Sequence, residues 1–301
     1  MPEGPEILIT SQYLKTKLKK KKIKSIQILG GRYTHQNLKG FDLTKSTPLI
    51  VEMIDSKGKF LWMRLTDKNG KSIYMMNTFG MTGRWSFREN PSSRLKIVVQ
   101  SNTDPSKKYD LYYVDPRNFG TIEFTSNELL LQKKLDKLAP DVLKTQMNDG
   151  DLMGMIRHFI STSRKDKNLV KVLMDQEAIV SGIGNYLVAE ILYDAKLNPH
   201  RNIDDLSVDE MKTLAHSIRK ISKIAYYDNN SGYMEHFKIF MKTHSAMIDS
   251  GVFPNYHPDI KTNKKFKFKV YQQEKDPHGN DVENDQIVKD RTIHWVKAVQ
   301  M

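Results

Sequence analysis

The chain has 301 residues, enough for one large domain or two ordinary ones, and its 48 Lys and Arg against 35 Asp and Glu give a formal net charge of +13. That charge favours a polyanionic partner, nucleic acid before an acidic membrane surface, and the absence of cysteine excludes disulfides, thiolate zinc sites and a cysteine nucleophile. No stretch approaches the roughly 20 apolar residues of a membrane span, and the N-terminus is acidic where a signal peptide is basic, so we expect an intracellular protein that is not secreted.

The chain opens with Met-Pro-Glu-Gly-Pro-Glu, followed by a helical pattern through about Lys20. Removal of Met1 would leave the ring nitrogen of Pro2 as a free secondary amine, and an α-amino group has a pKa of about 8. Attack of this amine on a carbonyl-like carbon would give an iminium ion, which acts as an electron sink. Glu3 and Glu6 would then handle the protons. The alternative is that these carboxylates only suit the first turn of a helix.

Short strand-like segments make up most of the first half. Apolar residues alternate at Leu49, Val51 and Met53, and the turn-forming residues 56–59 follow, which predicts a hairpin. Several such segments at roughly ten-residue spacing indicate a β-sandwich behind the N-terminal helix. The segments are residues 23–30, 48–65, 71–81, 94–102 and 109–124.

Helical spacing replaces the strand pattern after Glu128, so the fold class is α+β. The breaker sequence at 138–143 places a domain boundary near Pro140, between a domain of residues 1–139 and one of residues 140–301. The last segments return to strand spacing and predict a long hairpin at about residues 262–298. The helical segments are residues 127–138, 150–161, 169–184, 185–197 and 207–227, and the two late strands are residues 265–272 and 291–296.

Two lysine-rich segments leave alternatives open. The sequence KLKKKKIK at 17–24 is typical of a localisation signal or a DNA-binding arm, or else of a solvated helix end whose last turn favours cations. The sequence KTNKKFKFK at 261–269 interleaves bases with Phe266 and Phe268, which suits a ribbon laid along phosphates. An edge strand protected by lysines would have the same pattern.

The most informative stretch is QEAIVSGIGNYLVAEILY at 176–193, where two helical patterns meet at Ser181–Gly184. Its glycines allow a tight turn that exposes the N–H groups of a new helix N-terminus. Such a terminus binds anions, and Asn185 beside it can donate to a phosphate oxygen. Together with the opening MPEGPE, the stretch resembles the helix–two-turn–helix of the Fpg/Nei family, the formamidopyrimidine-DNA glycosylases and endonucleases VIII.

Further motifs of that family occur in order along the chain. KGKFLW resembles the strand with its second catalytic amine, which gives Lys59, and FGMTGRW resembles its Gly-Met-Ser-Gly loop with Met81 at the tip. DPRNFG matches its Asp-Pro-Arg-x-Phe-Gly motif and gives Arg117 and Phe119. DRTIHW resembles the last strand of its C-terminal finger and gives Arg291.

The resemblance implies a bifunctional DNA glycosylase and AP lyase of base excision repair. Pro2 would attack C1′ of an extruded nucleotide while Glu3 opens the sugar and Glu6 shuttles protons. Lys59 and Arg291 would hold the phosphates whose departure cuts the strand by β,δ-elimination. Extrusion of a base costs a few kcal/mol of unstacking. The DNA-binding set would be Met81 and Phe119 as wedges, Arg117 as donor to the unpaired base, and Gly184 and Asn185 at the phosphates.

The chain also departs from the family pattern. Many members carry a four-cysteine zinc finger at the C-terminal hairpin, whereas this chain resembles the zincless branch of eukaryotic Nei-like enzymes, so we expect no metal and no cofactor. His278 and His294 could in principle bind a metal, but surface histidines satisfied by hydrogen bonds are the expected case. Thr78 stands where bacterial members often have histidine, which puts one phosphate contact in doubt.

The expected substrates are oxidised pyrimidines and ring-opened or hydantoin purines, because Gly4 stands where enzymes that excise oxidised guanine have leucine. Three alternatives remain: an 8-oxoguanine-preferring enzyme, a non-catalytic binder of damaged DNA, and a structural nucleic-acid protein that shares only the helix–two-turn–helix. We expect a monomer whose partner is damaged DNA, located in the nucleus or the cytoplasm, with no membrane attachment.

Overall fold

The computed structural model describes residues 2–101, 104–229, 233, 237–253, 266–289 and 291–301. The chain forms two compact units, one made of Pro2 with Glu6–Lys137 and the other of Glu3–Pro5 with Leu138–Met301. The division at the end of the first half thus falls between Lys137 and Leu138, and the assignment of domains 1–139 and 140–301 stays a prediction.

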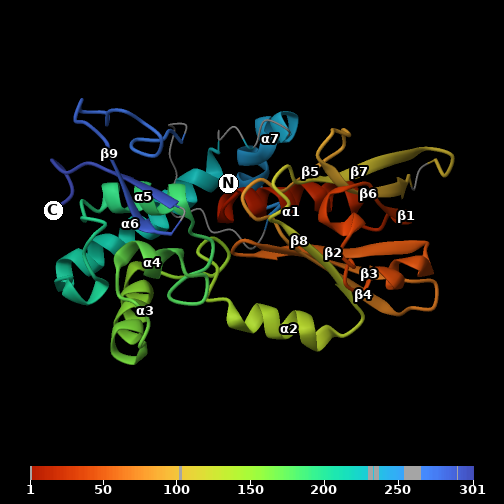
Figure 1. The fold of residues 1–301 in the computed structure, drawn as a ribbon, viewed down its shortest axis with the longest axis horizontal. Helices are drawn as coiled ribbons and strands as arrows, with labels where there is room; N and C mark the ends of the chain where they lie inside the picture. Colours follow the sequence, from red (N-terminus) through yellow and green to blue (C-terminus); the bar gives the residue numbers. More distant parts are fainter. Residues whose placement is uncertain (1, 102–103, 230–232, 234–236, 254–265, 290) are drawn as a thin grey trace. The chain divides into compact units, whose positions relative to one another are not determined.

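The first unit holds most of helix α1 and eight antiparallel strands in one sheet, in the order β5-β7-β6-β1-β2-β3-β4-β8 among the described residues (Figure 1). The predicted helix and strands are present. Their bounds are α1 Gly4–Leu18, β1 Lys22–Ile28, β2 Leu49–Lys57, β3 Phe60–Thr66, β4 Ser72–Thr78, β5 Arg84–Ser86, β6 Ser93–Gln100, β7 Lys108–Val114 and β8 Thr121–Thr125.

The sheet folds into the expected sandwich at the junction of β1 and β2. These strands share only two residue pairs, Lys22 with Ile50 and Ile23 with Leu49. Figure 1 shows β5, β6 and β7 in one layer and β2, β3, β4 and β8 in the other. The two layers of the sandwich are therefore joined in one continuous sheet through this short ladder, which the alternating pattern of single strands does not reveal.

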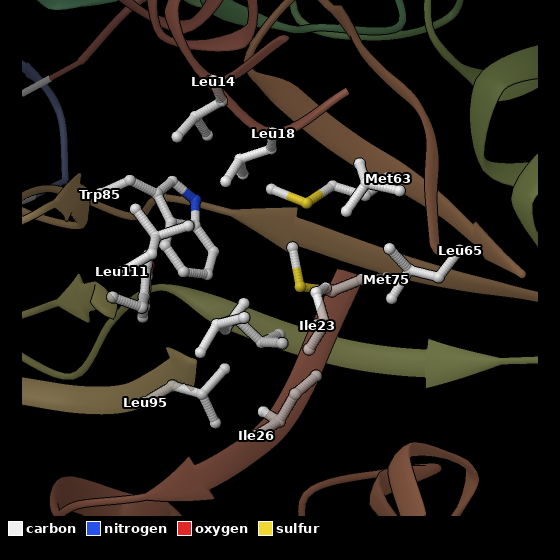
Figure 2. Close-up of a cluster of buried hydrophobic side chains, with 14 of the residues drawn as sticks. Leu14, Leu18, Ile23, Ile26, Met63, Leu65, Met75, Trp85, Leu95 and Leu111 are labelled. Carbon is white, nitrogen blue, oxygen red and sulfur yellow. The ribbon is translucent and has the colours of Figure 1, made fainter. Parts of the chain in front are cut away.

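Side chains from both layers and from α1 fill one core (Figure 2). Leu14 of α1, Met75 of β4 and Trp85 of β5 are each fully buried. The indole N–H of Trp85 donates to the Asn77 side chain at 3.1 Å, so the polar atom of this large ring is satisfied. Burial of each such side chain contributes about 1.5–3 kcal/mol, which makes this core a rigid support for the loops at the strand ends.

The hairpin predicted at 56–59 joins β2 and β3 through a two-residue turn. Lys57 pairs with Phe60, so Gly58 and Lys59 form the turn, and Gly58 has a φ of 54°. A positive φ is what such turns require at their first position. The prediction is confirmed. Helix α2 (Glu128–Lys137) closes the unit, and the Lys57 ammonium donates to the carbonyl of Leu135 at 2.8 Å.

The second unit is helical with a C-terminal hairpin, as predicted. Ser207 caps α6 with a reciprocal capping box that includes Glu210. Helix α7 follows α6 and was not predicted, because its sequence lies next to polar segments that weaken the helical pattern. The helices are α3 Asp149–Thr162, α4 Leu169–Met174, α5 Asn185–Asp194, α6 Val208–Tyr227 and α7 Lys238–Asp249.

Helix α4 is shorter than its sequence pattern, which extended to residue 184. It ends at Met174 because Asp175 is extended, with a ψ of 112°, and the Asp175 carboxylate accepts the N–H of Glu177 at 2.9 Å. Residues 175–184 therefore form a connection between α4 and α5 that carries the two turns. The prediction that two helices meet directly at Ser181–Gly184 is wrong.

The hairpin consists of β9 (Glu283–Val288) and β10 (Arg291–Trp295). The first strand was predicted at residues 265–272, and this is wrong for the described part of that range. The N–H groups of Lys269, Val270 and Tyr271 each donate to the Glu190 carboxylate at 3.0 Å, so they are unavailable to a strand ladder. The preceding residues 254–265, including most of the basic ribbon segment, lie outside the described residues.

Candidate active site

The N-terminus of α5 is capped by a side chain distant in sequence. The Glu3 carboxylate accepts the N–H groups of Gly184 at 2.7 Å, Tyr186 at 2.8 Å and Leu187 at 3.2 Å. The first N–H groups of a helix have no intrahelical partner, and the helix dipole places positive partial charge there. Glu3 is 1% exposed, so a buried carboxylate stabilises this terminus.

Two glycines make the close approach to Glu3 possible. The Gly4 N–H donates to the Gly182 carbonyl at 2.7 Å, and a Cβ on Gly4 would lie 2.9 Å from the Gly182 Cα. A Cβ on Gly184 would lie 2.5 Å from the Glu3 carboxyl carbon. Since real Cβ atoms do not approach other atoms this closely, both positions need glycine. Residues 3 and 4 are thereby held against the Gly-Ile-Gly turn.

Gln176 organises the connection before α5, a role that sequence reasoning missed. Its side-chain oxygen accepts the Gly182 N–H at 2.8 Å, and its amide nitrogen donates to the carbonyls of Met174 and Ile183, each at 2.9 Å. One amide thus ties the end of α4 to the turn that holds Glu3. The signal in the sequence was a polar residue between two apolar runs.

The structure brings Asn185 next to Arg291. The Asn185 amide donates to the Thr292 carbonyl at 3.0 Å, and Arg291 is the first residue of β10. The Asn185 side chain also hydrogen-bonds to the phenol of Tyr271. Burial, as the largest cause, and the Glu3 charge raise the pKa of Tyr271 and outweigh this bond, which acts to lower that pKa. The Tyr271 ring lies 6.1 Å from the ring of Tyr186 in the first turn of α5, so this phenol is near the same helix terminus. Sequence reasoning did not single out Tyr271.

In the first unit, two loops at strand ends are fastened together. The Asp115 carboxylate accepts the Gly120 N–H at 2.7 Å and the Thr82 hydroxyl at 2.9 Å. Gly80 has a φ of 60°, and a Cβ there would lie 2.6 Å from the Phe119 carbonyl carbon. The loop carrying Met81 and the loop carrying Phe119 therefore form one surface.

The side chains predicted as wedges differ in exposure. Phe119 is 55% exposed, and the Arg117 guanidinium lies 5.1 Å from the centre of its ring. Met81 is half-buried. An exposed phenylalanine beside an exposed arginine cannot be explained as core packing, so Phe119 is not a core residue.

The remaining predicted residues of the first unit lie on other elements. Lys59 is half-buried on the β2–β3 turn, Pro2 is buried directly before Glu3, and Glu6 is 1% exposed in the first turns of α1. The Thr78 hydroxyl at the end of β4 hydrogen-bonds to that of Thr121. The chemical roles predicted for these residues stay predictions.

The two histidines considered as metal ligands occupy different surroundings. His278 is exposed, whereas the His294 ring packs 5.0 Å from that of Tyr271, and burial lowers the pKa of His294. In the described part of the chain, no group of three or more His, Cys, Asp or Glu is arranged to hold a metal ion.

Comparison with known proteins identifies the fold and both units. Residues 1–122 match the formamidopyrimidine-DNA glycosylase N-terminal domain, residues 138–234 match the H2TH domain and residues 258–301 match the C-terminal domain of the same enzymes. The chain belongs to the Fpg/Nei family. This is a family of DNA glycosylases with AP lyase activity that act in DNA repair, and the H2TH match corresponds to the helix–two-turn–helix at α4 and α5.

Relatives come from both branches of the Fpg/Nei family. A formamidopyrimidine-DNA glycosylase of Mycoplasma genitalium is 27% identical over 258 residues, which cover 80% of this chain and 86% of the relative. An endonuclease 8 of Salmonella arizonae is 27% identical over 255 residues, which cover 82% of this chain and 90% of the relative. The near-equal identities do not assign the chain to either branch.

Solved structures share the whole fold. MutM in complex with DNA containing carbocyclic 8-oxo-G has a TM-score of 0.72 at 21% identity, with both chains fully covered. Lactococcus lactis Fpg in complex with DNA containing an abasic site has a TM-score of 0.72 at 21% identity over 99% of each chain. At this identity the likeness shows the fold alone. No helix among the described residues is long and apolar enough to cross a membrane.

Proposed function

We propose that this chain is a bifunctional DNA glycosylase and AP lyase that removes oxidised bases through an N-terminal proline Schiff base and cuts the strand by β,δ-elimination. The observation that carries the proposal is the position of Glu3, whose carboxylate accepts three N–H groups at the N-terminus of α5. Pro2 directly precedes Glu3 in the chain, and the helix terminus that holds Glu3 is of the kind that binds phosphate. Removal of Met1 completes the nucleophile.

The chemistry begins when the Pro2 nitrogen attacks C1′ of the damaged nucleotide. The glycosidic bond breaks, and the base leaves with the bonding pair and takes up a proton. Because three N–H donors and the helix dipole favour a charged Glu3, that carboxylate first accepts the proton released by the amine. It then delivers this proton to the ring oxygen, the C1′–O4′ bond opens, and an iminium ion joins Pro2 to the sugar.

Cleavage of the DNA strand follows because the iminium ion withdraws electrons from the sugar. The iminium ion acidifies the C2′ protons, so loss of one expels the 3′-phosphate, and a second elimination expels the 5′-phosphate. Glu6 shuttles protons around the amine in this scheme. Lys59 and Arg291 hold the departing phosphates, with Gly184 and Asn185 contacting the backbone, while Met81, Arg117 and Phe119 occupy the gap left by the extruded base.

For the substrate we propose oxidised pyrimidines and ring-opened or hydantoin purines. The structure gives Gly4 a packing reason, since a Cβ there would meet the Gly182 backbone, so Gly4 by itself does not separate these substrates from 8-oxoguanine. An 8-oxoguanine-preferring activity is therefore the second candidate. Initial rates on a panel of paired oxidised bases decide between them. We propose that the enzyme acts on damaged DNA as a monomer.

Borohydride trapping on duplexes that carry oxidised bases tests the chemistry. We expect a covalent protein–DNA adduct whose linkage maps to Pro2 by mass spectrometry. Pro2→Gly replaces the secondary amine with a primary amine at the same place and separates the need for proline from the need for any terminal amine. Undiminished trapping by a chain whose N-terminus is blocked would sink the proposal. DNA binding without any adduct on all lesions would favour the non-catalytic binder.

A further inference from the structure

Seven lysines gather at the junction of α1 and β1, with no acidic residue between positions 15 and 24. We call them the α1–β1 lysine cluster. All are exposed except one that is half-buried. The nearest aromatic contact is that of the Lys21 ammonium, 4.9 Å from the centre of the Tyr109 ring. The members are Lys15, Lys17, Lys19, Lys20, Lys21, Lys22 and Lys24.

The helix end explains only part of this charge. Lys15 and Lys17 lie in the last turn of α1, where cations complement the helix dipole. Lys22 and Lys24 lie beyond the helix, on the exposed face of β1, so the helix dipole does not account for their charge. Within the described residues, none of these four ammonium groups forms an ion pair. Elsewhere in the same unit lysines do find carboxylates, as Lys96 does with Asp110 at 2.8 Å.

The cluster continues across the sheet. Lys22 of β1 lies opposite Gln100 of β6, and Gln100 lies opposite Lys108 of β7, so a row of polar side chains crosses three strands on one face. Lys108 is exposed as well. So many like charges at one place repel one another, and a bound polyanion would relieve that repulsion.

The lysine-rich segment is part of the folded structure, and this helps to identify what it binds. The Lys20 N–H donates to the Val51 carbonyl at 2.7 Å, and the Val51 N–H donates to the Lys21 carbonyl at 3.0 Å. A linear localisation signal must be read as an extended peptide, and these bonds pin the segment to β2. A basic surface that is fixed in the fold instead suits the phosphate backbone of duplex DNA, which binds proteins mainly through its charge.

This surface lies far from the loops predicted to meet the lesion. Strand β7 starts at Lys108 and ends at Val114, directly before the loop with Arg117 and Phe119. Its seven residues span about 20 Å at 3.3 Å each. Helix α1 likewise separates Gly4 from the cluster by about 20 Å at 1.5 Å per residue. The two surfaces stand at opposite ends of the same strands.

We propose that the α1–β1 lysine cluster is a second nucleic-acid surface, which holds the phosphate backbone of a DNA duplex other than the one that carries the lesion. One molecule would then bridge two DNA segments and could pass from one to the other without release. The inference goes beyond the proposed chemistry, since it requires neither Pro2 nor a damaged base.

A bridging assay with the full chain tests it. Beads carrying undamaged duplex are loaded with protein and offered a second, fluorescent undamaged duplex. We expect capture by the wild type, in proportion to protein concentration, and loss of capture by the variant Lys17→Gln, Lys19→Gln, Lys22→Gln. The corresponding Lys→Arg variant should restore it. For three lost phosphate contacts, the salt dependence of capture should fall by roughly 2 to 3 units of slope.

Matched controls make each outcome decisive. The variant Lys133→Gln, Lys134→Gln, Lys137→Gln removes equal charge from the exposed side of α2 and should still capture. Single-turnover excision on a short lesion duplex should be unchanged in all variants. Unchanged capture by the α1–β1 variant, or an equal loss of capture by the α2 control, would overturn the proposal. So would capture that rises with the square of protein concentration, because two protein molecules would then form the bridge. Slowed excision by the α1–β1 variant would also overturn it, because the lysines would then contact the lesion duplex. Binding of an import receptor without DNA bridging would also overturn it. Failed trapping at Pro2 would leave this result untouched.

Discussion

At the scale of single residues, the position of Glu3 depends on a neighbouring glycine, which has no side chain to collide with its carboxyl group. Gly184 begins α5 at a point where a Cβ would meet the Glu3 carboxyl carbon at 2.5 Å. The carboxylate could move only by giving up its three N–H donors, which are buried and would lose their partner. The position of Glu3 therefore depends on a glycine more than 180 residues away in the sequence.

Replacing Gly184 with Ala should displace Glu3 and, with it, the proposed nucleophile. We expect single-turnover excision to fall by about 100-fold, the effect of a shift of roughly 1 Å at reacting atoms. Gly154→Ala is the matched control, because Gly154 lies within α3 with nothing within 4 Å of its added Cβ. That change should raise helix stability by about 0.5–1 kcal/mol and leave excision intact. Equal rates in the two variants would contradict the role of Gly184.

The two predicted wedge residues, Met81 and Phe119, give a second prediction at this scale. Replacing Met81 and Phe119 with Ala should strongly slow excision of a paired lesion, because these side chains would brace the gap after extrusion. A lesion in single-stranded DNA or an abasic site has little pairing to break, so its cleavage should suffer much less. Leu129→Ala removes another exposed apolar side chain, 67% exposed on α2, and should change neither rate. An equal loss on all three substrates would show that the two residues support the fold instead.

At the scale of elements, two carboxylates fasten the C-terminal hairpin and the segment that precedes it. Asp285 of β9 accepts the indole N–H of Trp295 of β10 at 2.6 Å and contacts His200 at 2.9 Å. Asp276 accepts the Tyr193 hydroxyl at 3.0 Å and the N–H of His278 at 2.8 Å. Asp285 thus joins the two strands of the hairpin and contacts His200, whereas Asp276 ties the segment before the hairpin to Tyr193 of α5.

This arrangement predicts a pH dependence of stability. Burial acts to raise the pKa of Asp276, but hydrogen bonds from Asn280 and His278 outweigh it and lower the pKa to about 2. Because the folded pKa lies below the ordinary value of 3.8, the contribution is present above about pH 4 and is lost as pH falls through about 2. Asp276→Asn should lower the unfolding temperature at neutral pH, and this difference should shrink towards pH 2.

Asp281→Asn is the control for that measurement. Its carboxylate is 86% exposed and pairs only with the exposed Lys275 in the described structure, so its loss should change the unfolding temperature little at any pH. Thermal unfolding followed from pH 7 to pH 2 distinguishes the two variants. If Asp276→Asn lowered the unfolding temperature by the same amount across that range, the effect would come from packing and not from the charge of the carboxylate.

The elements also show what the sequence could and could not predict. The strands of the first unit and the capped helix α6 were predictable, because their apolar periods are regular and their turns carry glycine or capping residues. The end of α4 and the irregular course of residues 269–271 were not. Both depend on side chains, Asp175 and the distant Glu190, that take backbone N–H groups away from regular structure. The spacing of apolar residues indicates which side chains are buried, but it does not reveal which side chains compete for backbone N–H groups.

The same distinction holds for the residues proposed to act on DNA. Pro2, Arg117 and Asn185 belong to short motifs and could be named from the sequence. Gln176 and Tyr271 could not, since their importance lies in what they contact after folding. A motif marks a residue that does chemistry or meets a ligand, whereas the residues that position it are found only in three dimensions.

At the scale of the whole molecule, the first unit carries the entire net charge of +13, because the second unit has equal numbers of basic and acidic residues, whereas the proposed chemistry draws on residues of both units. Lys59, Met81, Arg117 and Phe119 belong to the first unit, while Glu3, Gly184, Asn185 and Arg291 belong to the second. DNA binding should therefore lose affinity when phosphate contacts of either unit are removed. Affinity for undamaged duplex measures this property, because phosphate contacts carry no sequence information directly.

Arg291 provides the sharpest test of that view. It begins β10 next to Thr292, whose carbonyl accepts the Asn185 amide, so the arginine stands beside the terminus of α5. Arg291→Ala should weaken binding to damaged and undamaged duplex about equally and reduce the slope of log affinity against log salt by about 1. Lys275→Ala removes one charge from the same unit, but that lysine is already paired with Asp281 at 2.6 Å, so its slope should stay close to the wild type. An unchanged slope for Arg291→Ala would place this side chain away from the DNA backbone, and the proposed hold on the departing phosphate would then have to come from the first unit.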